Sequence, residues 1–158
     1  MVQDVDLIYI LKSLGLTILF VGLIGFERQR RNKIAGLTTH LLVALGAAGL
    51  TMVQQVMVQD SIQFIAENPN FAGQVVLERQ RIVAQIVSGI GFLGTGAILK
   101  TNGYISGLTT ASTLWISAII GIIFGYGLYT LGITLSLLTL FILTIIKNVF
   151  RHMVEDQH

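Results

Sequence analysis

An uncharged run in the last third of the chain constrains the fold more than any other feature. No Asp, Glu, Lys or Arg occurs in residues 101–146. A helix needs about 20 apolar residues to cross the hydrocarbon core of a bilayer, so this run is long enough for two spans. Gly125-Tyr126-Gly127 is a turn-forming sequence near its middle. We therefore expect two membrane helices that fold back on each other there.

The other charges divide the rest of the chain in the same way. Only 11% of the 158 residues are charged, against roughly 25% in an average soluble domain. Residues 34–59 and 82–99 are also free of charge. We predict an all-α, polytopic membrane protein, with five transmembrane helices in a domain over residues 1–148 and a short cytoplasmic tail over 149–158. The predicted spans cover residues 7–26, 37–58, 82–99, 107–124 and 127–146.

The basic residues predict how this domain lies in the membrane. With the N-terminus outside, seven basic residues fall on the cytoplasmic side, and only Lys12, Arg79 and Arg81 fall on the outer side. Cytoplasmic loops carry an excess of Lys and Arg, so we expect the N-terminus outside and the C-terminus in the cytoplasm. The basic residues flank apolar spans instead of forming one soluble patch, which argues against nucleic-acid binding.

The segment between the second and third spans is the longest predicted loop. Its Glu67-Asn68-Pro69-Asn70 core is typical of a turn or a helix stop. The preceding residues 61–66 are mildly amphipathic, and two interpretations stay open for them. They either extend the second span or lie in the membrane interface.

A short internal repeat relates two of the predicted helix starts. Gly36-Leu37-Thr38-Thr39 recurs as Gly107-Leu108-Thr109-Thr110, and each copy opens a predicted span. This placement predicts two parallel-repeat hairpins plus a fifth helix. The threonines are suited to capping membrane helices. The alternative is that two positive helix ends lie side by side and form an anion or carboxylate site.

Small residues in the third and fourth spans predict close helix packing. Ala84, Ser88, Gly91 and Thr95 form one stripe at helical spacing on the third span. Small residues let membrane helices approach closely, so we predict the third span at the centre of the bundle. The alternative is a broken helix that lines a substrate path. The predicted packing positions are Gly25, Gly36, Ser88, Gly89, Gly91, Gly94, Gly96, Gly107, Ser117, Gly121 and Gly125.

Polar residues within or beside the spans are the functional candidates, because such groups are costly to place in a membrane. Glu27 is the single candidate metal ligand, although a local ion pair with Arg28 is the alternative interpretation. His40 either takes a proton or ligand role or only bonds a carbonyl. Arg81 is expected to pair with Glu78 or Glu67. The full set of polar candidates is Glu27, Arg28, Thr39, His40, Arg81, Gln85, Thr109 and Thr110.

Catalysis is not expected from this sequence. The chain has no cysteine, which removes thiolate nucleophiles and zinc–thiolate sites. It also has no Gly-x-Ser-x-Gly or His-Glu-x-x-His motif. We therefore predict no enzyme, no catalytic residue and no cofactor-binding residue.

Four segments together resemble the MgtC/SapB family of bacterial inner-membrane proteins. They are Gly25-Phe26-Glu27-Arg28-Gln29, Ala35-Gly36-Leu37-Thr38-Thr39-His40, residues 81–96, and Gly107-Leu108-Thr109-Thr110-Ala111. The resemblance covers residues 7–146. It implies a bacterial inner (plasma) membrane location and a virulence-associated family, linked to growth at low magnesium and to survival inside host cells.

Two features depart from the usual pattern of that family. Gln29 stands where the family usually has glutamate, and Thr38 stands where it usually has arginine. A charge pair of the family is therefore absent here. The few residues after the fifth predicted span resemble the short, SapB-like form without a C-terminal cytoplasmic domain.

Two functions are compatible with these features. The favoured one is a non-enzymatic regulator of another inner-membrane protein or of membrane ion homeostasis. The alternative is a small channel or carrier for magnesium or another cation. Mg²⁺ prefers carboxylates and retained water, and Glu27 is nearly the only acidic residue at a predicted span that could meet it. Both functions predict a homo-oligomer in the lipid bilayer, with a dimer favoured, and no cofactor other than that ion.

Overall fold

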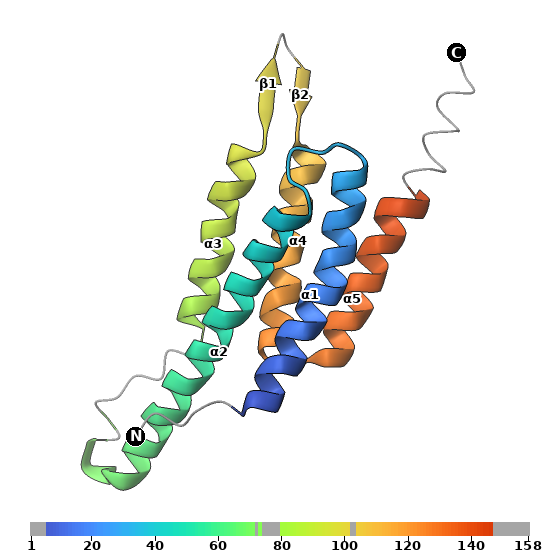
Figure 1. Ribbon diagram of the computed structural model, residues 1–158. Helices are drawn as coiled ribbons and strands as arrows, with labels where there is room; N and C mark the ends of the chain where they lie inside the picture. The colour runs from blue at the N-terminus through green and yellow to red at the C-terminus, as the bar shows by residue number, and fades with distance from the viewer. Residues whose placement is uncertain (1–5, 72, 74–79, 102–103, 147–158) are drawn as a thin grey trace, which may run out of the picture.

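The computed structural model describes residues 6–71, 73, 80–101 and 104–146 as a helical bundle (Figure 1). The predicted tail, residues 149–158, lies outside the described residues. The helical class is confirmed. The elements are α1 (Leu7–Arg30), α2 (Leu37–Glu67), a short 3-10 helix η1 (Pro69–Phe71), α3 (Arg81–Gly96), strands β1 (Leu99–Thr101) and β2 (Tyr104–Ser106), α4 (Leu108–Gly125), α5 (Tyr129–Phe141) and a π-helical turn η2 (Ile142–Ile146).

The helices are apolar and expose large hydrophobic side chains, as expected of a membrane protein. Within the described residues, α1, α2 and α4 are long and apolar enough to cross a bilayer. The helical segments 81–96 and 129–145 are apolar but shorter. Leu42 is 67% exposed and Phe92 is 82% exposed, and a soluble monomer rarely leaves such contiguous surface uncovered. The chain is therefore a membrane protein, and the number of five spans stays a prediction.

The second helix is longer than the predicted span. It continues to Glu67 instead of ending near residue 58, so residues 61–66 extend α2. Its end is fixed by Asn68, whose backbone N–H and side-chain amide both donate to the carbonyl of Phe64, at 2.9 and 3.1 Å. The predicted stop at residues 67–70 is confirmed. The first helix likewise continues to Arg30, beyond the predicted end at residue 26.

The third helix ends earlier than predicted, and a β-hairpin follows it. α3 ends at Gly96, and Leu99 of β1 pairs antiparallel with Ser106 of β2. The predicted helix to residue 99 is therefore wrong. Gly107 lies between β2 and α4 and has φ +88°. A Cβ built there would lie 1.9 Å from the carbonyl oxygen of Ala97. Only glycine fits both this conformation and this contact.

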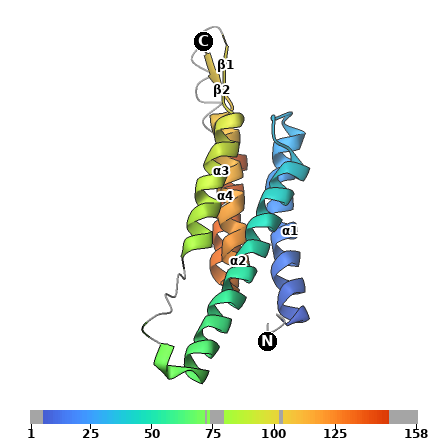
Figure 2. The same ribbon diagram turned by 90° about the vertical axis from the view of Figure 1, so that its left-hand side faces the viewer.

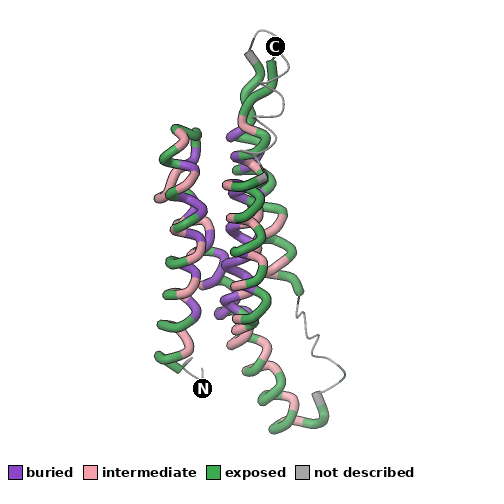
Figure 3. The backbone as a smooth tube through the Cα atoms, turned by 90° about the vertical axis from the view of Figure 1, so that its right-hand side faces the viewer, coloured by how far each residue is buried: buried purple, intermediate pink, exposed green. Residues whose placement is uncertain are grey.

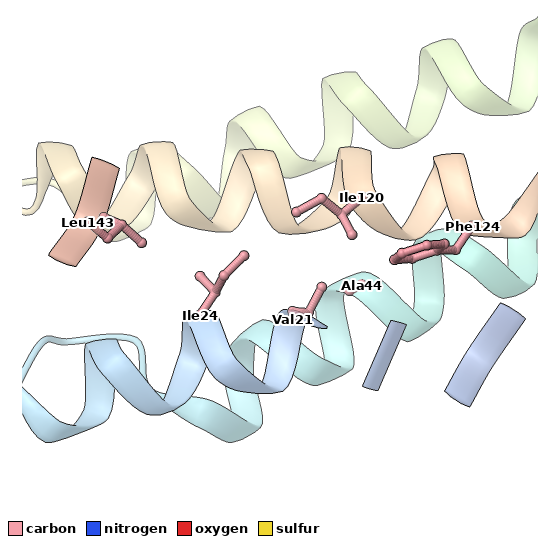
Figure 4. Packing of buried hydrophobic residues seen from close by; sticks show 6 residues of the cluster. All are labelled: Val21, Ile24, Ala44, Ile120, Phe124 and Leu143. Carbon is pink, nitrogen blue, oxygen red and sulfur yellow. The ribbon is translucent and has the colours of Figure 1, made fainter. Parts of the chain in front are cut away.

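The apolar core lies between α1, α2, α4 and the end of α5 (Figure 4). Phe124 of α4 stacks on Phe20 of α1, with ring centroids 6.0 Å apart. A Cβ at Gly121 would lie 2.2 Å from the carbonyl oxygen of Ala44. The helices α2 and α4 therefore pack backbone to backbone, as small residues allow in membranes. Figure 3 shows that the buried residues face the interior of the bundle.

The third helix lies at the edge of the bundle, against α4, instead of at its centre (Figures 1 and 2). Its buried residues are Ile86, Ile90 and Gly94. The predicted stripe of Ala84, Ser88, Gly91 and Thr95 is exposed in the described chain. Central packing of this helix was therefore a wrong prediction. Two Ile side chains and Gly94 bury against the bundle in place of the predicted stripe, because the large Ile side chains remove more apolar surface from contact with solvent.

The predicted packing glycines and serines divide into two groups. One group is buried or has an atom of another segment within 4 Å of a Cβ built at the position, namely Gly25, Gly36, Gly94, Gly107, Ser117, Gly121 and Gly125. The other group, Ser88, Gly89, Gly91 and Gly96, is exposed. No atom of the described chain lies within 4 Å of a Cβ at the three glycines of this second group. These positions do not pack against their own bundle.

Candidate functional site

A buried polar network joins three helices at one end of the bundle. Arg28 of α1 is 0% exposed, and its Nη2 donates to the hydroxyl of Thr110 on α4 at 3.0 Å. His40 of α2 is also 0% exposed, and its Nε2 lies 3.1 Å from the hydroxyl of Thr113 on α4. The Thr113 hydroxyl in turn lies 2.9 Å from the carbonyl of Thr110. One connected set of hydrogen bonds therefore holds α1, α2 and α4 together.

The hydrogen-bond partners of His40 fix the tautomer of its neutral ring. Its Nδ1 lies 2.7 Å from the carbonyl oxygen of Gly36, which can only accept, so Nδ1 carries a hydrogen. In the neutral ring, Nε2 must accept from the Thr113 hydroxyl. In the protonated ring, Nε2 donates, and that hydroxyl is then free to donate to the Thr110 carbonyl. A single hydroxyl rotation therefore distinguishes the two states.

Arg28 and Glu27 point to different surroundings although they are neighbours in the sequence. Glu27 forms an ion pair with Arg31 one turn later, with Oε1 and Nε 2.5 Å apart. Arg28 Nε and Nη1 are buried and have no hydrogen-bond partner among the described residues. The predicted local pairing of Glu27 with Arg28 is thus replaced by Glu27 with Arg31. Nε and Nη1 of Arg28 can therefore still donate to an acceptor. The buried charge of Arg28 is costly unless it is paired.

The start of α2 is shaped by Gly25 and Gln29. A Cβ at Gly25 would lie 2.8 Å from the Cα of Leu37, so only glycine lets α1 approach the first turn of α2 this closely. Gln29 Oε1 accepts the backbone N–H of Leu37 at 3.1 Å. The predicted threonine cap is not formed, because α2 has no side-chain cap from its own N-cap residue Gly36. Gln29, a departure from the family pattern, supplies the acceptor instead.

A second polar cluster at the opposite end of the bundle was not predicted. Tyr9 and Gln55 both donate to the carbonyl of Gly125, and the Gln55 Nε2 distance is 2.8 Å. Gln54 Nε2 donates to the hydroxyl of Tyr126 at 2.9 Å, and Gln54 Oε1 accepts the backbone N–H of Val83 at 3.0 Å. Two adjacent glutamines in an apolar helix were the available indication, because buried amides require partners.

The remaining candidates lie outside the first network. Thr39 and Thr109 are exposed on the first turns of α2 and α4. Arg81 and Gln85 line an apolar groove between α2 and α3, near the opposite end, while Glu78 lies outside the described residues. The described part of the chain contains no group of three or more His, Asp or Glu residues that could hold a metal ion. Glu27 is therefore an isolated carboxylate and not part of a built metal centre.

Comparison with known proteins agrees with the resemblance found in the sequence. The model of the MgtC family matches residues 14–152. YhiD of Escherichia coli (strain K12) is 41% identical over 87% of this chain and 60% of its own length. Protein MgtC of Brucella abortus (strain 2308) is 47% identical over 68% of this chain and 38% of its own. Protein MgtC of Salmonella typhimurium (strain 14028s) is 41% identical over 84% of this chain and 49% of its own.

These relatives are longer than the region they share with this chain, which spans 60% or less of their length. No solved structure matches the chain significantly. The four motif segments described above all lie within the residues that the family model matches. The match covers most of the chain, and on this evidence the chain belongs to the MgtC family.

Proposed function

We propose that the protein is a non-enzymatic regulator in the bacterial inner membrane, with its N-terminus outside and its C-terminus in the cytoplasm. It acts on another membrane protein, or on membrane ion homeostasis, through the exposed face of α3. The observation that carries this proposal is the stripe of Ala84, Ser88, Gly91 and Thr95, which is exposed in the described chain. A face of small residues offers lipid little apolar surface but lets another helix approach closely.

The magnesium connection comes from the relatives and is part of the proposal. Escherichia coli YhiD is named as a proposed magnesium transporter. Two carboxylates of the described residues are partly buried, Glu27 and Asp60. Glu27 Oε1 is paired with Arg31. Mg²⁺ is held by carboxylates together with retained water. These residues therefore support a role in magnesium homeostasis more readily than a magnesium path through one chain.

The packed core also favours regulation over transport by a single chain. The buried network and the second, partly buried polar cluster lie at opposite ends of the bundle, and fully buried apolar residues separate them, among them Val21, Ile24, Ile120 and Phe124. The buried hydroxyls of Thr17 and Ser136 bond the carbonyls of their own helices. An ion crossing this layer would lose its hydration without finding ligands. The second function, a cation channel or carrier, therefore requires a path formed between subunits of an oligomer.

Cysteine crosslinking tests the proposed face, because the chain is naturally free of cysteine. A Cβ at Gly91 meets no atom of the described chain within 4 Å, so Gly91→Cys leaves the bundle intact. Gly15→Cys on α1 is the matched control, since Gly15 is also an exposed helical glycine with open space around it. We expect a specific adduct in membranes from Gly91→Cys, with a second copy or with a partner, and none from Gly15→Cys.

Equal amounts of crosslinked adduct from Gly91→Cys and Gly15→Cys, or no adduct from either variant, would contradict the proposal. Transport is tested separately with the purified protein in liposomes. Magnesium or other cation flux that is reduced by Glu27→Gln would establish the alternative function. Absence of flux together with a specific Gly91→Cys adduct would support the regulator.

A further inference from the structure

The groove between α2 and α3 has the dimensions of a binding site for a long, narrow molecule. It has a volume of about 1120 Å³, slightly above the range of about 300–1,000 Å³ for small-molecule sites. On α3 its lining extends from Arg81 to Leu93, which is roughly 18 Å at the rise of an α-helix. One leaflet of the hydrocarbon core is about 15 Å deep. The groove is therefore about as long as one leaflet is thick.

The polarity of the groove changes from one end to the other. Leu42, Val43, Ile90 and Leu93 line one end and are entirely apolar. Ser61, Gln54, Gln85 and Arg81 lie toward the other end. Arg81 carries a guanidinium with five N–H donors, so it can bind a phosphate group in addition to any protein partner. The groove is therefore apolar at one end and has a positively charged opening, its mouth, at the end where Arg81 lies.

We propose that this groove binds one acyl chain of an anionic phospholipid, with the lipid phosphate at Arg81 and Gln85. The charge of the mouth matches an anionic headgroup, and the apolar end matches the tail. A second helix is a poorer occupant because most of the lining consists of larger side chains such as Leu50 and Met57, with Gly46 and Gly89 among them, whereas helix contacts in membranes favour small residues. The small-residue stripe of α3 containing Gly91 faces a different direction from the groove residue Gly89.

Two glycines in the lining allow the groove to be filled without disturbing the bundle. Gly46 of α2 and Gly89 of α3 line the groove, and a Cβ at either position meets no atom within 4 Å. Gly89→Leu would therefore project into the space proposed for the acyl chain. Gly15→Leu is the matched control on α1, outside the groove and equally open. Lys12→Gln is the charge control, because Lys12 lies at the same end of the bundle over the ring of Tyr129 and not in the groove.

Native mass spectrometry of the full chain tests the proposal, with phosphatidylglycerol and phosphatidylcholine added separately to the delipidated protein. We expect one phosphatidylglycerol to remain bound at a lipid concentration roughly tenfold lower than phosphatidylcholine requires, because the choline cation beside the phosphate of phosphatidylcholine is repelled by the Arg81 guanidinium. Arg81→Gln should remove this preference, and Gly89→Leu should reduce retention of both lipids. Lys12→Gln and Gly15→Leu should behave as the natural protein does.

Three results would overturn the proposal. The first is equal retention of the two lipids by the natural protein. The second is unchanged retention in Gly89→Leu. The third is a change of oligomer mass in Gly89→Leu with unchanged lipid retention, which would identify a second copy of the chain as the occupant. Crosslinking at Gly91 is read independently, so its failure and the failure of lipid binding are distinguishable.

Discussion

The hydrogen bond between Arg28 and Thr110 provides a direct test of the network that joins α1 to α4. Thr110→Val keeps nearly the same side-chain volume but removes the oxygen that accepts from Arg28 Nη2 at 3.0 Å. Both residues are buried, with 0% and 2% exposed, so water cannot replace the lost acceptor. Leaving a charged buried donor unpaired costs about 1.5–3 kcal/mol. At roughly 2–4 °C per kcal/mol for a chain of this size, Tm should fall by roughly 3–12 °C.

A double-mutant cycle separates this bond from other effects of the substitution. Arg28→Met replaces the guanidinium by an apolar chain, and a buried charge replaced in this way often leaves stability unchanged or improved. In the double variant of Arg28→Met and Thr110→Val, no donor is left without its acceptor. The double variant should therefore be more stable than Thr110→Val alone, with a coupling energy of about 1 kcal/mol or more.

The assay is thermal unfolding in detergent, followed by the fluorescence of the single tryptophan, Trp115. Thr109→Val is the matched control, because Thr109 is exposed on the same helix turn and surface substitutions usually change stability by less than about 0.5 kcal/mol. The reasoning would be refuted if Thr110→Val were no more destabilising than Thr109→Val. A coupling energy of zero would show that the two side chains do not act as a pair.

Four further substitutions at three positions test single contacts, each measured as a change in Tm in the same assay. Gly121→Val should be destabilising by about 1–3 kcal/mol or more, because its Cβ would collide with the carbonyl of Ala44. Gln29→Leu should cost about 1 kcal/mol by removing the acceptor for the Leu37 N–H, whereas Gln29→Glu should retain stability because a carboxylate also accepts at a helix start. Gly107→Ala should lower Tm, because its φ is +88° and its Cβ would lie 1.9 Å from the Ala97 carbonyl oxygen. An unchanged Tm would contradict this contact.

The sequence predicted that the helices exist, but it placed a boundary correctly only where local turn chemistry sets it, since α1, α2 and α3 end elsewhere than their predicted spans do. Charges and turn residues are local, so the turn at Gly127, with φ +74°, and the stop at Asn68 were both predicted correctly. The end of α3 was predicted wrongly because Leu99 is apolar and uncharged like the helix before it. Its strand pairing depends on a partner, Ser106, that a pattern of apolar residues does not reveal.

The candidate site was predicted only in part, for a related reason. Arg28, His40 and Thr110 were selected because polar groups at a membrane helix demand an explanation, and the structure brings these three together. Thr113 was missed because threonine is common in apolar helices and often bonds its own backbone. Which polar residue meets which depends on the rotation of each helix, and that rotation is set by packing across the whole bundle.

The two small-residue stripes show why a pattern alone cannot identify the face that a helix buries. Both stripes predict close contact, yet that of α4, with Gly121, lies against α2, and that of α3, with Gly91, lies open. The rest of each helix decides between these outcomes. α4 is apolar on nearly all sides and half of its span is buried, which places it at the centre. α3 buries Ile86 and Ile90 on one side, whereas its Phe92 is exposed. Burying that side against α4 leaves the small-residue stripe as the face available to a second molecule.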